Sequence, residues 1–247
     1  SDVYKRQLIP SGKAPAEPCT EFDAYSHVIL PGLINTHHHF YQTLTRALRP
    51  ALGKELFDWL KALYPVWSGH DPEGLAVATE LALTELLLSG CTTTSDHHYL
   101  YPKGLEEAVD IQVSVASQMG MRVTLTRGSM DLSQKDGGLP PDSVVQETDE
   151  ILADSERVVN RFHQSGPGAM VQIALAPCSP FSVTQHLMRQ TAELGAKMGP
   201  RWRQDGPRWP QDAPKTPQDG LRWLSRTIVG RCGGALVDVW FHCFSCC

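Results

Sequence analysis

Hydrophobic and polar positions follow a regular cycle between residues 28 and 198, in which short apolar runs alternate with longer mixed stretches. The apolar runs have the length and the β-branched content of strands, and they cover residues 28–35, 91–96, 121–128 and 168–177. The stretches with helical signals are residues 54–64, 72–89, 104–119, 143–163 and 182–197. Four strand–helix units in series predict a parallel sheet, in either a barrel or a doubly wound fold.

Residues at the boundaries support this assignment. Asp71 is expected to be the N-cap of the second helix, with Pro72 at its first helical position. Gly90 and Gly120 are placed to end the helices that precede them. Ser182 is expected to be the N-cap of the last helix.

The first apolar run, VILPGLIN at residues 28–35, is apolar on both of its alternating faces. Such a run is typical of a strand that is covered on both sides of a sheet. We therefore expect residues 28–35 to form a buried strand.

Both ends of the chain differ from this region. Residues 1–27 form a Pro-rich lead-in that we assign to part of a small β-domain, and residues 28–198 form the barrel region. In residues 199–219 the seven-residue unit GPRWRQD is followed by the variants GPRWPQD and APKTPQD, with five prolines in all. Proline excludes a heptad helix, so residues 199–247 are expected to be a low-complexity, disordered or aberrant tail.

Composition excludes several classes of function. The net charge of −5, without any basic cluster, argues against nucleic acid as a partner. No uncharged apolar run reaches the ~18 residues of a membrane span, and the first residues lack the order of a secretion signal. Seven cysteines, an odd number, argue against a disulfide framework. A cytoplasmic protein with mostly reduced thiols is expected.

Three consecutive histidines follow the first apolar run. In an extended chain alternate side chains share a face, so His37 and His39 point together and His38 points away. Two imidazoles at the end of a strand suit zinc or iron. A purification tag is excluded because the triplet is internal, but polar residues at a surface edge remain an alternative.

A second polar cluster, Asp96, His97 and His98, follows the second apolar run. In a parallel sheet both clusters lie at the carboxyl-end rim, where ligand-binding and catalytic groups gather. A shared pocket is the functional interpretation. The alternative is that Asp96 pins a turn and the histidines are ordinary loop residues.

The remaining candidates are weaker. Arg127, at the end of the third run, suits either a clamp on a substrate or a structural salt bridge, and its position alone favours the salt bridge. Cys178 has no partner in sequence and is a weak nucleophile candidate. His242 and the cysteines around it lack the second paired element that a zinc module needs.

Four segments, in order along the chain, resemble the amidohydrolase superfamily: PGLINTHHHFYQTLTRAL (31–48), ELLLSGCTTTSDHHY (85–99), MRVTLTRGSM (121–130) and VQIALAPCSPFSVT (171–184). Within that superfamily they are similar to the branch of cytosine-deaminase-like and triazine-hydrolase-like enzymes. The resemblance covers roughly residues 20 to 198.

The resemblance implies a (β/α)8 TIM barrel, of which this chain has about the first half and a remnant of the small β-domain. It implies one divalent metal ion, zinc or iron, with His37 and His39 as ligands. It also implies a pocket for a small heterocyclic substrate, lined by Gln42, His97, His98 and Arg127.

The implied reaction is hydrolytic deamination of a purine-like nitrogen heterocycle. Water activated by the metal attacks the ring carbon that bears the amino group, an acidic side chain moves the proton, and ammonia leaves. Hydrolysis of an s-triazine or another cyclic C–N compound is the alternative within the branch. Dimers are common in the family, so a homodimer is one expectation.

The chain also departs from the family pattern. The family has a strand-five His followed by a catalytic Glu, a strand-six His and a strand-eight Asp, yet no His-x-His-x-x-Glu occurs after residue 184. DVWFHC (238–243) resembles the strand-six motif, which makes His242 a candidate third ligand. This loss and partial return suggest that residues 199–237 were read out of frame. A truncated, catalytically incomplete fragment is therefore a further alternative.

Overall fold

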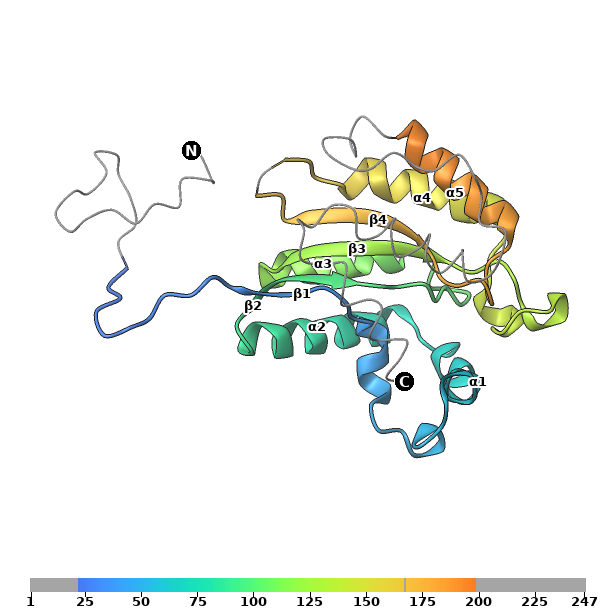
Figure 1. Cartoon of the computed structure of the whole chain (residues 1–247), viewed down its shortest axis with the longest axis horizontal. Coiled ribbons are helices and arrows are strands. Elements are labelled where there is room, and N and C mark those ends of the chain that lie inside the picture. Colours follow the sequence, from blue (N-terminus) through green and yellow to red (C-terminus); the bar gives the residue numbers. More distant parts are fainter. Residues whose placement is uncertain (1–21, 167, 199–247) are drawn as a thin grey trace.

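The computed structural model describes residues 22–166 and 168–198, so predictions for the lead-in, the repeat and His242 lie outside the described residues. The described strands form one parallel sheet in the order β1-β2-β3-β4 (Figure 1). Their bounds are Leu33–Asn35 for β1, Cys91–Asp96 for β2, Arg122–Ser129 for β3 and Val171–Pro177 for β4. The predicted parallel α/β arrangement is confirmed.

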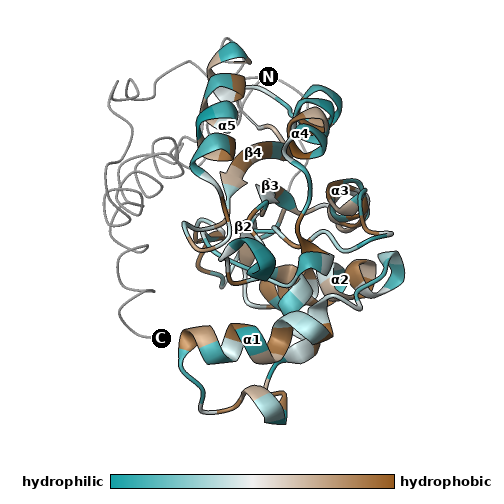
Figure 2. Cartoon of the chain, turned by 90° about the vertical axis from the view of Figure 1, so that its right-hand side faces the viewer, coloured by the Kyte–Doolittle hydropathy of each residue, from teal (hydrophilic) through white to brown (hydrophobic). Residues whose placement is uncertain are grey.

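Five α-helices connect and follow these strands. They are α1 (Leu56–Trp67), α2 (Pro72–Leu88), α3 (Ala108–Met119), α4 (Thr148–Phe162) and α5 (Gln185–Lys197). Helices α2 to α5 succeed one another around one side of the strands, while α1 lies apart from them (Figure 2). This is the half-ring expected for part of a barrel, because each parallel connection must cross outside the sheet.

Apolar side chains fill the layer between the strands and the outer helices. Leu83 of α2, Val109 of α3, Val158 of α4 and Leu125 and Ile173 of the strands are all nearly inaccessible to solvent. Complete burial of such a side chain contributes roughly 1.5–3 kcal/mol, so this cluster is the main support of the fold. A second apolar cluster lies at the carboxyl ends of the strands and includes Tyr41, Trp67, Leu100 and Met130.

The helix signals near residues 71, 90 and 120 are confirmed. The Asp71 carboxylate accepts a hydrogen bond from the Gly74 amide at 2.7 Å, and Pro72 opens α2. Gly90 and Gly120 have φ values of +83° and +70°, the left-handed conformation that glycine adopts without strain.

Several predicted helix boundaries are wrong. Ser182 is not the N-cap of α5. The N-cap is Thr184, whose side chain accepts a hydrogen bond from the Leu187 amide, and the helix begins at Gln185. The Ser182 carbonyl instead accepts hydrogen bonds from the amides of Asp131 and Leu132. Ser182 is thus used to join two loops.

Other boundaries also differ from the predicted ones. The helix predicted from residue 143 begins at Thr148, after a 3-10 turn over Asp142–Val144, and α3 begins at Ala108 rather than at residue 104. The first helix extends three residues beyond its predicted end, with Pro65 inside it. Two 3-10 turns, Phe40–Thr45 and Arg49–Ala51, were not predicted.

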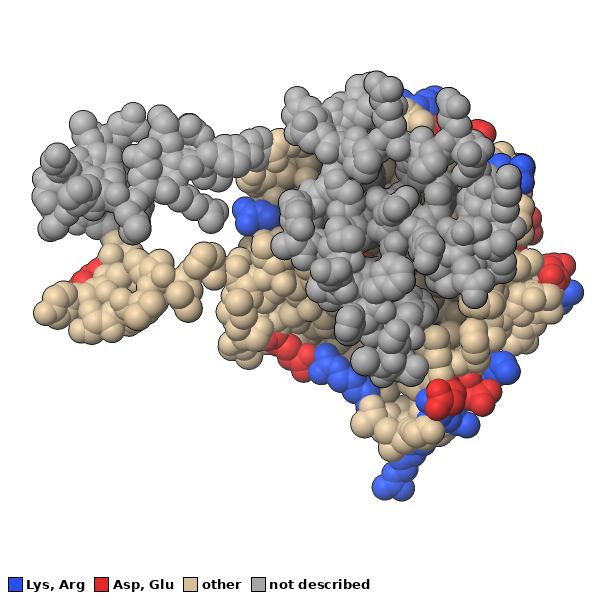
Figure 3. All heavy atoms as spheres, viewed as in Figure 1, with Lys and Arg blue, Asp and Glu red and all other residues tan. Residues whose placement is uncertain are grey.

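The expectation that residues 28–35 form a strand covered on both faces is also wrong. Only Leu33–Asn35 pair with a neighbour, and Val28, Ile29 and Leu30 are 85%, 80% and 75% exposed. The reason is that β1 is an edge strand within the described residues, with β2 on one side only. The segment before β1 extends from the body as a mostly uncharged arm (Figures 1 and 3).

Candidate functional site

The loops that follow β1 and β2 meet at the carboxyl end of the sheet. The His97 amide donates a hydrogen bond to the His38 carbonyl at 2.7 Å, and the Thr94 hydroxyl donates one to Asn35 Oδ1 at 3.2 Å. These bonds bring the two histidine clusters together, as the parallel sheet predicts.

Three imidazole rings gather at this point. The His37 and His39 ring centroids are 4.8 Å apart, and the His97 ring lies 6.3 Å from His37 and 5.6 Å from His39. The His38 ring packs instead against Phe40, at 5.2 Å. The pairing of His37 with His39 therefore follows the expected alternation, although these residues come after the strand rather than within it.

The tautomer of His39 follows from its hydrogen bond. His39 Nδ1 lies 2.7 Å from the His97 carbonyl oxygen, which can only accept, so Nδ1 carries the proton. The lone pair then resides on Nε2. A backbone carbonyl that binds one ring nitrogen in this way commonly orients a metal-ligating histidine.

Burial keeps these rings uncharged. Burial lowers the pKa of His37, and it lowers the pKa of His39 well below its ordinary value. The pKa of His97 falls to about 3 through burial, with a smaller contribution from His37. Neutral imidazole is the form that binds metals.

Asp96 ends β2, directly before His97, and is completely buried. One carboxylate oxygen accepts the Phe40 amide at 2.6 Å, and the other accepts Gln112 Nε2 at 2.7 Å. Burial raises the pKa of Asp96 to about 7, although these hydrogen bonds oppose the rise. Asp96 does pin a turn, which was one of the two interpretations of this cluster.

A hollow of about 350 Å³ opens beside the histidine pair. Its walls include the predicted Gln42 and two residues that the sequence did not indicate, Arg46 and Trp59. Trp59 comes from α1, which the sequence predicted only as a helix. The periodicity of a helix does not reveal which of its residues faces a distant loop.

His98 and Arg127 lie apart from this hollow. His98 is fully buried, donates from Nε2 to the Leu100 carbonyl at 2.8 Å, and contacts the rings of Tyr41 and Tyr101. Burial lowers its pKa to about 3. Arg127 is paired with Asp154 at 2.5 Å, and its guanidinium carbon lies 3.8 Å from the centre of the Tyr101 ring. These contacts are those of a structural ion pair, and a substrate contact by Arg127 stays a prediction.

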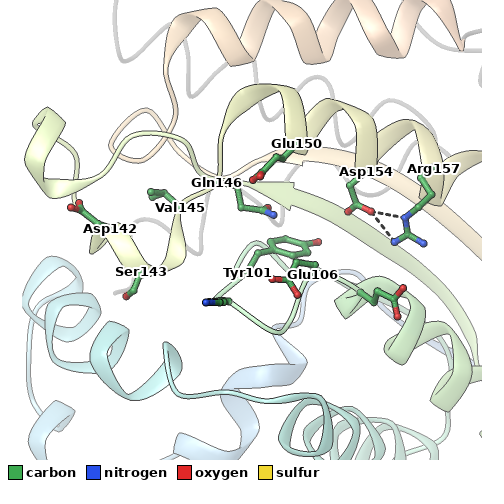
Figure 4. Close-up of a pocket in the computed structure, with 11 residues that line it drawn as sticks. Tyr101, Glu106, Asp142, Ser143, Val145, Gln146, Glu150, Asp154 and Arg157 are labelled. Atoms are coloured by element: carbon green, nitrogen blue, oxygen red, sulfur yellow. Dashed lines mark hydrogen bonds and ion pairs between the residues drawn. The ribbon is translucent and has the colours of Figure 1, made fainter.

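A second hollow, of about 630 Å³, lies near the start of α3 and of α4 (Figure 4). Tyr101, Glu106, Gln146 and Arg157 are among the residues that line it. Asp154 lies in its wall and binds both Arg127 and Arg157. This hollow is therefore lined by the Asp154–Arg157 ion pair of α4, and not by the histidine cluster.

Gly128 of β3 supports the loop that carries His97 and His98. Its amide donates to the His98 carbonyl at 2.8 Å, and a side chain at this position would overlap that oxygen and the backbone of Tyr99. The strand and the loop can approach this closely only because residue 128 is glycine.

The donor set fits a divalent metal in part. The His37 and His39 rings are close together and uncharged, and the tautomer of His39 is defined. These are the properties that binding of zinc or iron requires. Within residues 22–166 and 168–198, no group of three or more His, Cys, Asp or Glu side chains is arranged to hold a metal ion. The described residues thus offer part of a ligand set.

Two other expectations concern the thiols and the membrane. Cys91 and Cys178 are free, and burial raises the pKa of Cys178 to about 11, which leaves little thiolate at neutral pH. Among the described helices, none has the length and apolar character to cross a bilayer.

Known proteins share both the sequence and the fold. The chain is 62% identical over 192 residues to 8-oxoguanine deaminase of Pseudomonas aeruginosa, which covers 77% of this chain and 43% of that protein. It is 36% identical over 197 residues to hydroxydechloroatrazine ethylaminohydrolase of a Pseudomonas species, with 78% and 41% covered. The chain therefore spans about two fifths of the length of these curated relatives.

A solved structure supports the same assignment. Atrazine chlorohydrolase TrzN from Arthrobacter aurescens TC1, complexed with zinc, matches with a TM-score of 0.65 and 28% identity, over 68% of this chain and 39% of that chain. The described α/β half-ring is thus part of an amidohydrolase TIM barrel. The amidohydrolase family model matches residues 28–202, and the chain belongs to the amidohydrolase family.

Proposed function

We propose that the chain carries the first half of the active site of a metal-dependent hydrolase that deaminates a purine-like nitrogen heterocycle, with 8-oxoguanine as the first substrate to test. The observation that carries this proposal is the 62% identity to 8-oxoguanine deaminase over 192 residues, in a chain whose histidine hollow lies within the family match at residues 28–202. At the same position the structure has paired, neutral imidazoles beside a space for a small molecule.

The residues of the hollow have distinct roles in this proposal. His37 and His39 would hold the metal, which when bound supplies the Lewis acidity that makes water nucleophilic at neutral pH. The Gln42 amide can bind the polar edge of a heterocycle. Trp59 offers an aromatic face against which a flat ring can stack.

A triazine ring is the second candidate substrate. It is favoured by the 36% identity to hydroxydechloroatrazine ethylaminohydrolase and by the structural match to atrazine chlorohydrolase TrzN. The two candidates share the metal position and differ in the ring that the hollow accepts. The cytoplasmic location and the homodimer stay predictions.

The experiment has two steps, because the chain covers only part of its relatives. First, the chain is assayed for bound metal, for ammonia release from 8-oxoguanine, isoguanine and cytosine, and for ammonia or alkylamine release from hydroxylated triazines. Second, residues 28–198 replace the matching region of the Pseudomonas aeruginosa deaminase, and the chimera is assayed on the same compounds. We expect the chimera to release ammonia from 8-oxoguanine most rapidly.

Matched variants of the chimera test the metal ligands. His37→Ala and His39→Ala should each abolish metal retention and turnover, whereas His38→Ala, whose ring packs on Phe40, should keep both. A folded chimera that binds metal but prefers hydroxylated triazines would transfer the proposal to the second candidate. A folded chimera that retains metal in both the His37→Ala and His39→Ala variants would refute the ligand assignment.

A further inference from the structure

We propose that Asp96 is the positioning residue of the histidine pair, and that it fixes the orientation and the tautomer of His39 from beneath the site. Asp96 is enclosed below the rim, so it acts through the two loops and not by contact with substrate. The proposal deepens the proposed function. The role of the metal rests on that proposed function, whereas the hydrogen-bond geometry around Asp96 does not.

The first step of the argument is that Asp96 holds the residue next to His39. Its Oδ1 atom accepts the Phe40 amide at 2.6 Å, which fixes the backbone immediately after His39. A hydrogen bond from a backbone amide to a buried carboxylate is short and strong, since one partner is ionisable and water is excluded. The Phe40 side chain is itself buried in the main apolar core, so this point of the loop is held on two sides.

The second step is that the same residue orders the loop that binds the His39 ring. Asp96 ends β2, and His97 follows it directly. The His97 amide donates to the His38 carbonyl, and the His97 carbonyl accepts His39 Nδ1–H, both at 2.7 Å. A shift of Asp96 would therefore move both the His39 backbone and the acceptor that selects its tautomer.

The third step concerns the support of Asp96 from α3. Gln112 is fully buried and donates from Nε2 to Asp96 Oδ2 at 2.7 Å. In the described part of the chain, Gln112 Oε1 has no hydrogen-bond partner. Gln112 thus binds Asp96 although its own Oε1 stays without a hydrogen bond. This arrangement indicates that the fold holds the Asp96 carboxylate in one position.

The test uses the full chain labelled with 15N-histidine and no metal. The His39 ring, assigned by loss of its signals in His39→Gln, should show the Nδ1–H tautomer in the wild type. In Asp96→Ala we expect a mixture of tautomers at His39, while His163, at the far end of α4, keeps its signals. Asp96→Asn should preserve the tautomer, because its amide oxygen can accept from Phe40 and Gln112 can turn its Oε1 toward the new NH2 group.

Zinc affinity of the chimera that carries residues 28–198, measured by competition with a chromophoric chelator, supplies the second readout. Loss of a residue that orients a ligand typically costs about 10–100-fold in metal affinity, so Asp96→Ala should lose at least about 10-fold and Asp96→Asn much less. Gln112→Ala should follow Asp96→Ala in direction, and Gln118→Ala, an exposed glutamine of the same helix, should match the wild type.

Defined results would overturn the proposal. It fails if Asp96→Ala folds and retains the His39 tautomer, or if Asp96→Asn is as damaging as Asp96→Ala. If Asp96→Ala does not fold, Gln112→Ala decides, and an unchanged His39 signal in that variant refutes the proposal. If the tautomer shifts as expected in the chain while the folded chimera binds no zinc, the positioning role stands and the proposed function fails.

Discussion

His98 is an uncharged imidazole enclosed by aromatic rings, and its protonation should be coupled to unfolding. Its pKa is about 3 in the folded chain, because of burial, against 6.5 for an exposed histidine. The unfolded chain therefore binds the proton more tightly. The contribution of uncharged His98 to the free energy of unfolding is therefore fully present above pH 6.5. It is lost as the pH falls toward 3, by up to about 1.4 kcal/mol per pH unit.

This dependence can be measured by urea denaturation between pH 4 and pH 7. His98→Gln should show a shallower loss of unfolding free energy with acid than the wild type, whatever its stability at pH 7. His27→Gln, at an exposed position, is the control and should follow the wild-type slope. Parallel slopes for His98→Gln and the wild type would show that His98 does not carry this effect.

At the scale of single residues, the sequence predicted those features that depend only on local geometry. Alternation in an extended chain predicted that His37 and His39 share a face, and the parallel sheet predicted their approach to His97. Trp59 and Gln112 were not predicted, since their contacts depend on how α1 and α3 are rotated against loops far away in sequence.

At the scale of the elements, an ion pair between Arg127 and Asp154 ties β3 to α4. The Arg127 side chain is fully buried and that of Asp154 is 18% exposed, so neither charge is well hydrated. Removing one partner leaves the other charge buried and unpaired, which typically costs about 3–5 kcal/mol. Asp154→Asn should therefore lower the unfolding free energy by about 3 kcal/mol, measured by urea denaturation.

An exposed ion pair supplies the control for this measurement. The Nζ atom of Lys197 in α5 lies 3.8 Å from Oε1 of Glu156 in α4, and both side chains are substantially exposed. Lys197→Met should change the unfolding free energy by less than about 0.5 kcal/mol. Similar losses in the two variants would mean that burial of Arg127 does not determine the strength of its pair.

The sequence predicted which elements exist better than where they begin. The capping residue Asp71 and the stop signals at Gly90 and Gly120 were recognisable because their chemistry is local. The N-cap of α5 moved to Thr184 because Asp131, from the loop after β3, binds the Thr184 amide and hydroxyl at 2.7 Å and 2.5 Å. A tertiary contact thus decided between two hydroxyl residues that the sequence alone could not rank.

At the scale of the whole molecule, the exposed apolar segment beside β1 should promote self-association of the chain as given. Val28, Ile29 and Leu30 precede an edge strand whose Leu33 and Ile34 are also exposed. Unpaired edges and contiguous apolar surface are the usual causes of association between sheets. Light scattering after size-exclusion chromatography should show a mass that increases with protein concentration.

Charged substitutions test whether this segment is responsible. Ile29→Lys and Ile34→Lys should each reduce the association. Leu88→Lys, at a leucine near the end of α2 that is 84% exposed, should not. Association that persists equally in all three variants would place the interface elsewhere.

The barrel type was predictable from four ordered motifs, whereas the exposure of β1 was not. Whether a strand has neighbours on both sides is a property of the complete sheet, and residues 28–35 contain no information about it. Their apolar character nevertheless fits a complete barrel, in which the sheet closes upon its first strand and leaves no edge.

Gly128 has a practical consequence for mutagenesis of the histidine hollow. The loop that carries His97 and His98 packs directly on the backbone of Gly128, and any side chain at residue 128 would displace this loop. Libraries intended to reshape the pocket should therefore leave residue 128 constant and vary the wall contributed by Gln42 and Trp59. Gln42 and Trp59 can be varied because they line open space, whereas residue 128 cannot because it is already in contact with the loop of His98 and Tyr99.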